Sequence, residues 1–343
     1  MNSLIPPEIS LLSSLSFLNL SNSLFSGQIP HELSGISKLA LLDLSFNYLY
    51  GDFPIAIFNL PGLLVLNVSD NENLSGYLPE FNTTSPFREL DIADTEFSGT
   101  IPSTIGNLKS LNRLRLKNCY FSGSIPASIG QIPRSFSQLK NLEYLSLSEN
   151  NFTGTVEVDI FFSSRNLAIL SLSGCKITLN SPHHSNFSLP KLKSLSLARC
   201  NLTEFPYFLQ FASELMALVL RGNNIHGNIP NWIWNASNLE LIDLGANFLT
   251  GFERNLIAIQ ISKNCGALQS PPDDKQDDSE EDKFPSGYDW LFILLGLGSG
   301  LVVGFVMGDI SMDRHPWLIR GIVRKFGQTQ KKPRTRRRQI IRA

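Results

Sequence analysis

The sequence predicts a solenoid of the α/β type, in which about ten copies of a leucine-rich unit place parallel β-strands on the concave side. The prediction rests on three observations: a unit that recurs about every 24 residues, its fixed leucine spacing, and Gly and Pro late in each copy. In the clearest copy, Leu39, Leu42 and Leu44 precede Asn47 and Gly51. One such unit cannot bury its own apolar face, so the copies must stack around a shared core.

Ten units align on a Leu-x-Leu pair, which we expect to form a short strand with inward-pointing leucines. The anchors, defined as the second leucine-type residue of each pair, are spaced by 23 to 25 residues, with one interval of 31 before Leu147. Gly and Pro then turn the chain back along the outer side. The anchors are Leu20, Leu44, Val68, Ile92, Leu116, Leu147, Leu172, Leu197, Leu220 and Leu244.

The position three residues after each anchor, here called the ladder position, is expected to satisfy backbone groups between neighbouring units. An Asn side chain suits this task because it both donates and accepts hydrogen bonds. Three cysteines also occupy the position, and we interpret them as ladder residues rather than as a metal site or disulfides. The ladder residues are Ser23, Asn47, Asn71, Thr95, Cys119, Asn150, Cys175, Cys200, Asn223 and Asn247.

Charged residues flank the inward leucines of units four and five and therefore face the concave side. Strands about 4.8 Å apart would pair Glu89 with Arg113. They would also pair Asp91 with Arg115, and each ion pair would contribute about 0.2–1 kcal/mol. The alternative is a ligand site with Lys117 unpaired and a tyrosine as an aromatic contact. The candidate ligand-binding patch is Glu89, Asp91, Arg113, Arg115, Lys117 and Tyr144.

Eight Asn-x-Ser/Thr sequons are candidates for glycosylation if the array enters the secretory pathway. Asn19 and Asn67 lie between inward leucines, so glycans there would block part of the concave surface. The glycosylation candidates are Asn19, Asn67, Asn73, Asn82, Asn151, Asn186, Asn201 and Asn235.

An uncharged run, Trp290–Met307, predicts a single transmembrane helix, because its 18 residues would span about 27 Å. Eleven Lys or Arg from Ile310 onward place the following tail in the cytosol, which gives a type I plasma-membrane protein. The predicted organisation is a repeat ectodomain over 1–251, a degenerate junction and acidic linker over 252–289, a transmembrane helix over 290–308 and a basic cytoplasmic tail over 309–343.

Within the predicted span, four glycines recur every fourth residue and share one helix face. Such a face allows close packing of a partner helix in a membrane. The tail is too short for a catalytic domain, and its basic cluster suits anionic lipid rather than nucleic acid. Met1–Leu20 lacks the features of a secretory signal, so we expect a shortened product. The partner face is Gly296, Gly300, Gly304 and Gly308.

No catalytic, metal-binding or cofactor-binding constellation is predicted, so the sequence favours a binding protein over an enzyme. The adjacent His183 and His184 lie in a polar stretch between units, without a metal-ligand partner in the flanking sequence. There is also no Gly-rich phosphate loop followed by Lys.

The chain resembles plant receptor-like proteins in four features taken together. They are the repeat consensus, with Leu-Ser-x-Asn followed by Gly-x-Ile-Pro, the acidic linker, the Gly-x-x-x-Gly span and the basic tail. Plant receptor-like proteins are leucine-rich repeat surface receptors without a kinase, and many act in disease resistance. The resemblance implies an extracellular peptide, protein or glycan ligand, and a receptor-like kinase that pairs through the transmembrane helix. It also implies that Cys265 is the second half of a C-terminal pair.

Two alternatives to a signalling receptor remain open at this stage. One is a non-signalling binder, such as a decoy or an inhibitor of cell-wall enzymes built on the same repeat. The other is a truncated product without function, because the resemblance also implies an N-terminal cap and more repeats than this chain holds.

Overall fold

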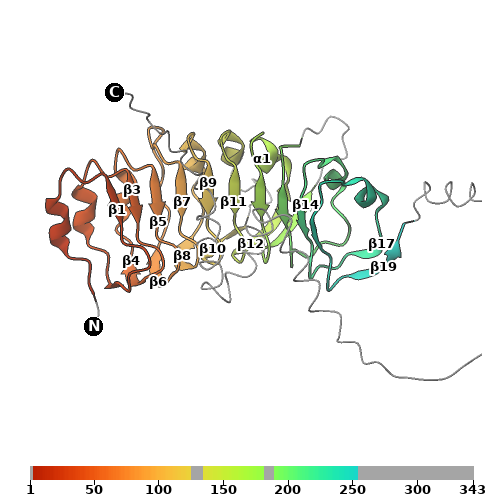
Figure 1. Cartoon of the computed structure of the whole chain (residues 1–343), viewed down its shortest axis with the longest axis horizontal. Helices are drawn as coiled ribbons and strands as arrows, with labels where there is room; N and C mark the ends of the chain where they lie inside the picture. The colour runs from red at the N-terminus through yellow and green to blue at the C-terminus, as the bar shows by residue number, and fades with distance from the viewer. Residues whose placement is uncertain (1–2, 125–133, 181–188, 254–343) are drawn as a thin grey trace, which may run out of the picture. The chain divides into compact units, whose positions relative to one another are not determined.

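A computed structural model describes residues 3–124, 134–180 and 189–253 (Figure 1). The chain divides into two compact units, Met1–Pro271 and Pro272–Ala343, and all described residues belong to the first. Ten parallel strands form one sheet, here called the main sheet, with each strand beside that of the next unit. Its strands are β1 (Phe17–Asn19), β3 (Leu41–Asp43), β5 (Val65–Asn67), β7 (Glu89–Asp91), β9 (Arg113–Arg115), β11 (Tyr144–Ser146), β13 (Ile169–Ser171), β15 (Ser194–Ser196), β16 (Ala217–Val219) and β18 (Leu241–Asp243).

The leucine frame is confirmed by the position of these strands. The first leucine of each pair lies in the middle of a strand and the anchor follows its end, as with Leu42 and Leu44, both fully buried. Adjacent strands pair without offset, so that Leu42 stands beside Leu18 and Leu66. Residues at equivalent positions of successive units therefore form columns along the array.

A second parallel sheet runs beside the main one, and the sequence analysis did not predict it. Its strands follow the ladder position, where an inward residue such as Leu49 alternates with exposed ones. It comprises β2 (Ser26–Gly27), β4 (Tyr48–Asp52), β6 (Asn71–Gly76), β8 (Thr95–Gly99), β10 (Tyr120–Ser124), β12 (Asn151–Glu157) and β14 (Lys176–Asn180), and a separate pair is formed by β17 (His226–Ile229) and β19 (Phe248–Phe252).

Short 3-10 helices carry the chain back on the other side of the core. Six of those described begin after a proline, whose ring holds φ between −58° and −75° and thus directs the chain into the turn. The helices are η1 (Pro7–Leu11), η2 (His31–Gly35), η3 (Ile55–Asn59), η4 (Ser103–Asn107), η5 (Arg134–Gln138), η6 (Tyr207–Phe211), η7 (Asn231–Asn235) and the α-helix α1 (Asp159–Phe162).

Asn47 shows how the ladder position joins two units. Its Nδ2 donates to the carbonyl oxygens of the anchors Leu20 and Leu44, each 2.9 Å away. Its Oδ1 accepts from the backbone N–H groups of Ser23 and Phe25 in the preceding unit. One buried side chain therefore satisfies backbone groups that would otherwise be unpaired between the turns.

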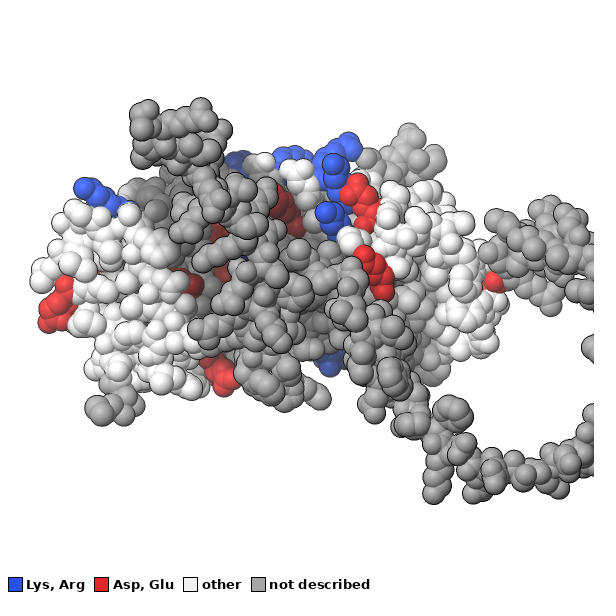
Figure 2. Space-filling model, viewed as in Figure 1, with Lys and Arg blue, Asp and Glu red and all other residues white. Residues whose placement is uncertain are grey.

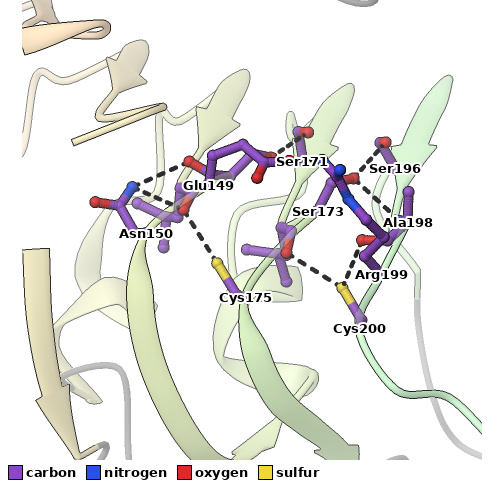
Figure 3. A network of polar contacts seen from close by, with 12 residues as sticks. Glu149, Asn150, Ser171, Ser173, Cys175, Ser196, Ala198, Arg199 and Cys200 are labelled. Atoms are coloured by element: carbon purple, nitrogen blue, oxygen red, sulfur yellow. Dashed lines mark hydrogen bonds and ion pairs between the residues drawn. The ribbon is translucent and has the colours of Figure 1, made fainter. Parts of the chain in front are cut away.

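The three cysteines occupy the ladder as predicted. The Sγ atoms of Cys119, Cys175 and Cys200 donate to the preceding anchor carbonyls at 3.1–3.2 Å, and Figure 3 shows the last two. All three are buried free thiols. Burial raises the pKa of Cys119 to about 11 and the pKa of Cys175 and Cys200 to about 12, so these thiols stay protonated and donate.

A further column of hydrogen bonds lies two residues after each anchor. There the backbone has a positive φ in all ten units, between 50° and 72°, and the N–H donates to a carbonyl of the next unit in the first nine. Gly adopts this conformation without strain, and Asn and Asp tolerate it. The column is Asn22, Phe46, Asp70, Asp94, Asn118, Glu149, Gly174, Arg199, Gly222 and Ala246.

Both ends of the described array expose large apolar side chains. Leu11 is 79% exposed in the first unit and Phe248 is 58% exposed in the last. The predicted transmembrane helix, the predicted linker and Cys265 lie outside the described residues, and within those residues no helix has the length and apolarity that a membrane crossing requires.

We predict that Asn47→Ala lowers the free energy of unfolding by about 2–4 kcal/mol, because two N–H groups and two carbonyls lose their buried partner. Asn47→Cys should lose about half as much, since a thiol keeps the donor function. Urea titration of both variants tests this, with the exposed Asn224→Ala as control. If Ala and Cys lowered the free energy of unfolding equally, the donor function of the ladder side chain would not contribute separately from its acceptor function.

Candidate ligand site on the main sheet

The candidate patch lies where β7, β9 and β11 run side by side. Glu89 pairs in register with Arg113, and Asp91 pairs with Arg115, as the leucine spacing predicts. The Arg113 Nη1–Glu89 Oε2 distance is 3.7 Å, and each side chain is 43% exposed. Arg115 Nη1 lies 3.0 Å from Asp91 Oδ2, and both side chains are more buried. Both predicted ion pairs are therefore present, the inner one in tighter contact.

Tyr144 on the neighbouring strand supports the two guanidinium groups. Their central carbons lie 5.6 Å (Arg113) and 5.9 Å (Arg115) from the ring centroid, within the range of cation–π attraction. Tyr144 itself is only 9% exposed. The ring thus holds the arginines in place, and its role in the patch is to orient them.

Lys117 departs from the prediction. The sequence suggested an unpaired lysine that a ligand could meet, but Lys117 is 7% exposed and has a partner within the chain. The prediction that it is unpaired was wrong. A buried ammonium is stable only when it is paired or hydrogen-bonded, and the leucine frame alone does not reveal such a partner. The half-exposed charges of the patch are therefore Glu89 and Arg113.

Three aspartates lie together beside the arginines. Burial, followed by the negative charge of Asp94, raises the pKa of Asp70 to about 7. Burial also raises the pKa of Asp91, although the guanidinium of Arg115 opposes this. Asp94 accepts a hydrogen bond of 2.8 Å from Asn118. The leucine frame does not reveal Asp70 and Asp94, which stand in the positive-φ column rather than among the leucines.

A third ion pair spans three units of the positive-φ column. Glu149 and Arg199 are 50 residues apart and meet across Gly174 (Figure 3). A Cβ at Gly174 would lie 2.5 Å from Glu149 Oε2, so a side chain there would require the Glu149 carboxylate to move. Next to it, Ser148 and Ser171 share a hydrogen bond of 2.6 Å. This part of the sheet is polar and held by its own contacts.

The remaining predicted sites can be placed only in part. Asn19 and Asn67 lie on main-sheet strands as predicted, and Asn73, Asn82, Asn151, Asn201 and Asn235 are exposed. Asn186, the two histidines and the glycine face lie outside the described residues. Residues 3–124, 134–180 and 189–253 contain no group of His, Cys, Asp and Glu that could hold a metal ion.

Figure 2 shows how charge is distributed on one face of the molecule. Lys and Arg side chains lie next to Asp and Glu side chains, and toward both ends of the array most visible atoms are uncharged. Opposite charges in contact give a patch of mixed sign. Such a patch suits a ligand that carries both charges better than a polyanion.

Comparison with known proteins agrees with the repeat. The family described as Leucine Rich Repeat matches residues 14–36, 87–108, 110–132, 141–162 and 214–236. The chain is 37% identical to Receptor like protein 22 of Arabidopsis thaliana over 147 residues, which covers 39% of this chain and 19% of that protein. It is 34% identical to Receptor-like protein 18 of the same plant over 189 residues, with coverages of 51% and 22%.

Solved structures share the fold. The complex PEPR1-AtPEP1 superimposes with a TM-score of 0.62 at 28% identity, covering 73% of this chain and 38% of that one. The Arabidopsis receptor kinase HAESA, solved with the peptide hormone IDA and the co-receptor SERK1, gives a TM-score of 0.53 at 28% identity, with coverages of 76% and 42%. The curated relatives are much longer, and the chain spans 14–22% of their length.

The stacked parallel sheets, the Asn and Cys ladder and the family match define a leucine-rich-repeat protein. Its similarity to the Arabidopsis receptor-like proteins confirms the resemblance found in the sequence. The predicted solenoid of ten units is likewise confirmed by the ten strands of the main sheet.

We predict that Asp70→Asn raises the thermal midpoint at pH 7.5 by a few degrees and gives a much smaller gain at pH 4.5. A carboxyl whose pKa is raised from 3.8 to about 7 in the folded state binds its proton more tightly there than when unfolded. Its contribution to stability is therefore full below pH 4 and is lost as the pH rises toward 7. Calorimetry of both proteins at the two pH values tests this, and an equal gain at both would contradict it.

Proposed function

We propose that the chain binds an extracellular peptide on its main sheet, as part of a plant cell-surface receptor. The observation that carries the proposal is the half-exposed Glu89–Arg113 pair, which offers one charge of each sign on a sheet otherwise rich in small side chains. A peptide that places a cation near Glu89 and a carboxylate near Arg113 would replace this weak contact with two charge-assisted hydrogen bonds.

The buried neighbours prepare the patch for this role. Tyr144 and the Asp91–Arg115 pair hold the strands and the Arg113 side chain in position, so that little conformational entropy is lost on binding. The receptor kinase HAESA is solved in complex with the peptide hormone IDA, which supports a peptide as the ligand class here.

Exchanging the charges of Glu89 and Arg113 distinguishes an effect on peptide binding from an effect on folding. The full chain is used to select peptides from a phage-displayed library of random sequences, and their affinity is measured for a variant with both Glu89→Arg and Arg113→Glu. This variant keeps an ion pair, so we expect the fold to persist while the selected peptides lose at least about tenfold in affinity, as for hot-spot charges. Tyr77→Ser on the second sheet is the control and should bind normally. Unchanged affinity in the exchange variant would exclude the patch.

We further propose that the receptor is anchored in the plasma membrane by residues 290–308 and signals in defence through a partner receptor kinase. The proposal is supported by the uncharged run and the four glycines in its sequence, and by the solved complex of HAESA with a co-receptor. Close helix packing needs small residues at the contact, because lipid provides no hydrophobic force between helices.

Replacing Gly300 and Gly304 with Leu should abolish co-purification of a membrane kinase with the full chain from plant membranes, without changing peptide affinity. Ala at the same two positions is the matched control and should retain most of the kinase, since it remains small. If the Leu variant keeps its kinase, the glycine face is not the contact. A chain that binds peptide but no kinase would be the non-signalling binder.

A further inference from the structure

The outward face of the second sheet carries four exposed tyrosines, and no ring contact of theirs is found within the described residues. Tyr48, Tyr50, Tyr77 and Tyr120 are 51–66% exposed and stand on or directly after strands β4, β6 and β10. The described strands from β2 to β10 of this sheet contain no Lys or Arg, and Glu72 and Glu96 lie among the tyrosines. Several exposed rings on one face offer a surface against which another group could pack.

The sequon at Asn73 lies within this row. Asn73 on β6 pairs in register with Tyr50 on β4, so the two exposed side chains stand side by side, about 4.8 Å apart at the backbone. The register between β6 and β8 shifts between Asn71 and Ser75, and this irregularity presents Asn73 to the outside. No other described sequon has an exposed tyrosine as its direct strand partner.

We propose that an N-glycan on Asn73 packs against the ring of Tyr50, with Tyr48 extending the same surface. The first sugar attached to Asn is N-acetylglucosamine, whose flatter face carries C–H groups. That face packs well on an aromatic ring, while the hydroxyl and amide groups remain in water or reach carboxylates such as Glu72. The chain's own glycan is the occupant because its attachment point adjoins the ring.

A stacked glycan would have two consequences. It would shield the apolar face of the second sheet from other molecules, and it would leave the main sheet open for a ligand. The inference rests on the extracellular location in the proposed function, because N-glycans are added in the secretory pathway.

The sequon at Asn201 provides a matched comparison. Asn201 is exposed, and its side chain accepts a hydrogen bond of 2.6 Å from Asn224 rather than adjoining an aromatic ring. Asn201 stands one residue after the ladder position, and the residues at this position in the two neighbouring units are Lys176 and Asn224. Neither is aromatic, so we expect a glycan on Asn201 to lack a ring on which to stack. The two sites differ in the neighbour that a first sugar would meet.

The test follows glycan release from the native full chain expressed in plant cells. Peptide N-glycosidase A is added, and tandem mass spectrometry of glycopeptides gives the release rate at Asn73 and at Asn201. We expect release at Asn73 to be about fivefold slower, the factor that corresponds to about 1 kcal/mol of stacking. Unfolding the protein first should make the two rates equal.

Variants at Tyr50 identify the cause. Tyr50→Ser should raise the rate at Asn73 to that at Asn201, whereas Tyr50→Phe, which keeps the ring, should leave it slow. Tyr120→Ser should have no effect at Asn73. Equal native rates at the two sites, insensitivity to Tyr50→Ser, or a glycan on Asn201 but none on Asn73 would overturn the inference. A chain without glycan at either site would overturn the extracellular location as well, whereas peptide binding is measured independently.

Discussion

The hydrogen bond from the ladder side chain to the anchor carbonyl of the preceding unit, which eight of the ten ladder residues make, is the interaction on which this structure depends. A leucine-rich unit turns its backbone sharply between the two sheets, and the carbonyls and N–H groups at that corner face a neighbouring unit rather than water. Asn47 satisfies four of them at once. Without such a side chain, apolar stacking would bury unpaired backbone groups and lose much of its benefit.

The ladder also explains which substitutions the array tolerates. Thr95, Cys119, Cys175 and Cys200 keep the donor that reaches a carbonyl, and the raised pKa of each thiol keeps that donor protonated. The asparagines also keep the acceptor role: Asn223 accepts from the N–H groups of Cys200 and Leu202 in the preceding unit. The cysteines thus act as buried hydrogen-bond donors in a polar network. Their spacing gave no indication of a redox or metal site.

The repeat allowed the main sheet, its register and both ion pairs to be predicted, because strict spacing converts sequence distance into spatial neighbourhood. Glu89 and Arg113 are 24 residues apart and stand on adjacent strands for this reason. The second sheet and the positive-φ column were missed, since they depend on backbone conformation rather than on apolar pattern. Gly174, Gly222 and the Asp or Asn residues at equivalent positions were the available signal, being residues that adopt or tolerate positive φ.

Burial, rather than position, decides which members of the patch can act. Spacing places Arg113, Arg115 and Lys117 on one strand face, yet Lys117 is enclosed and Arg115 is committed to Asp91, which leaves Arg113 half exposed. Contacts between neighbouring units thus pair or bury most of the charged side chains that a ligand could otherwise contact. A mixed-charge patch on such an array gains specificity from the few charged groups that the ladder and the strand pairs leave accessible. The ion pair between Glu89 and Arg113 is the weaker of the two in the patch, so a ligand can replace it most easily.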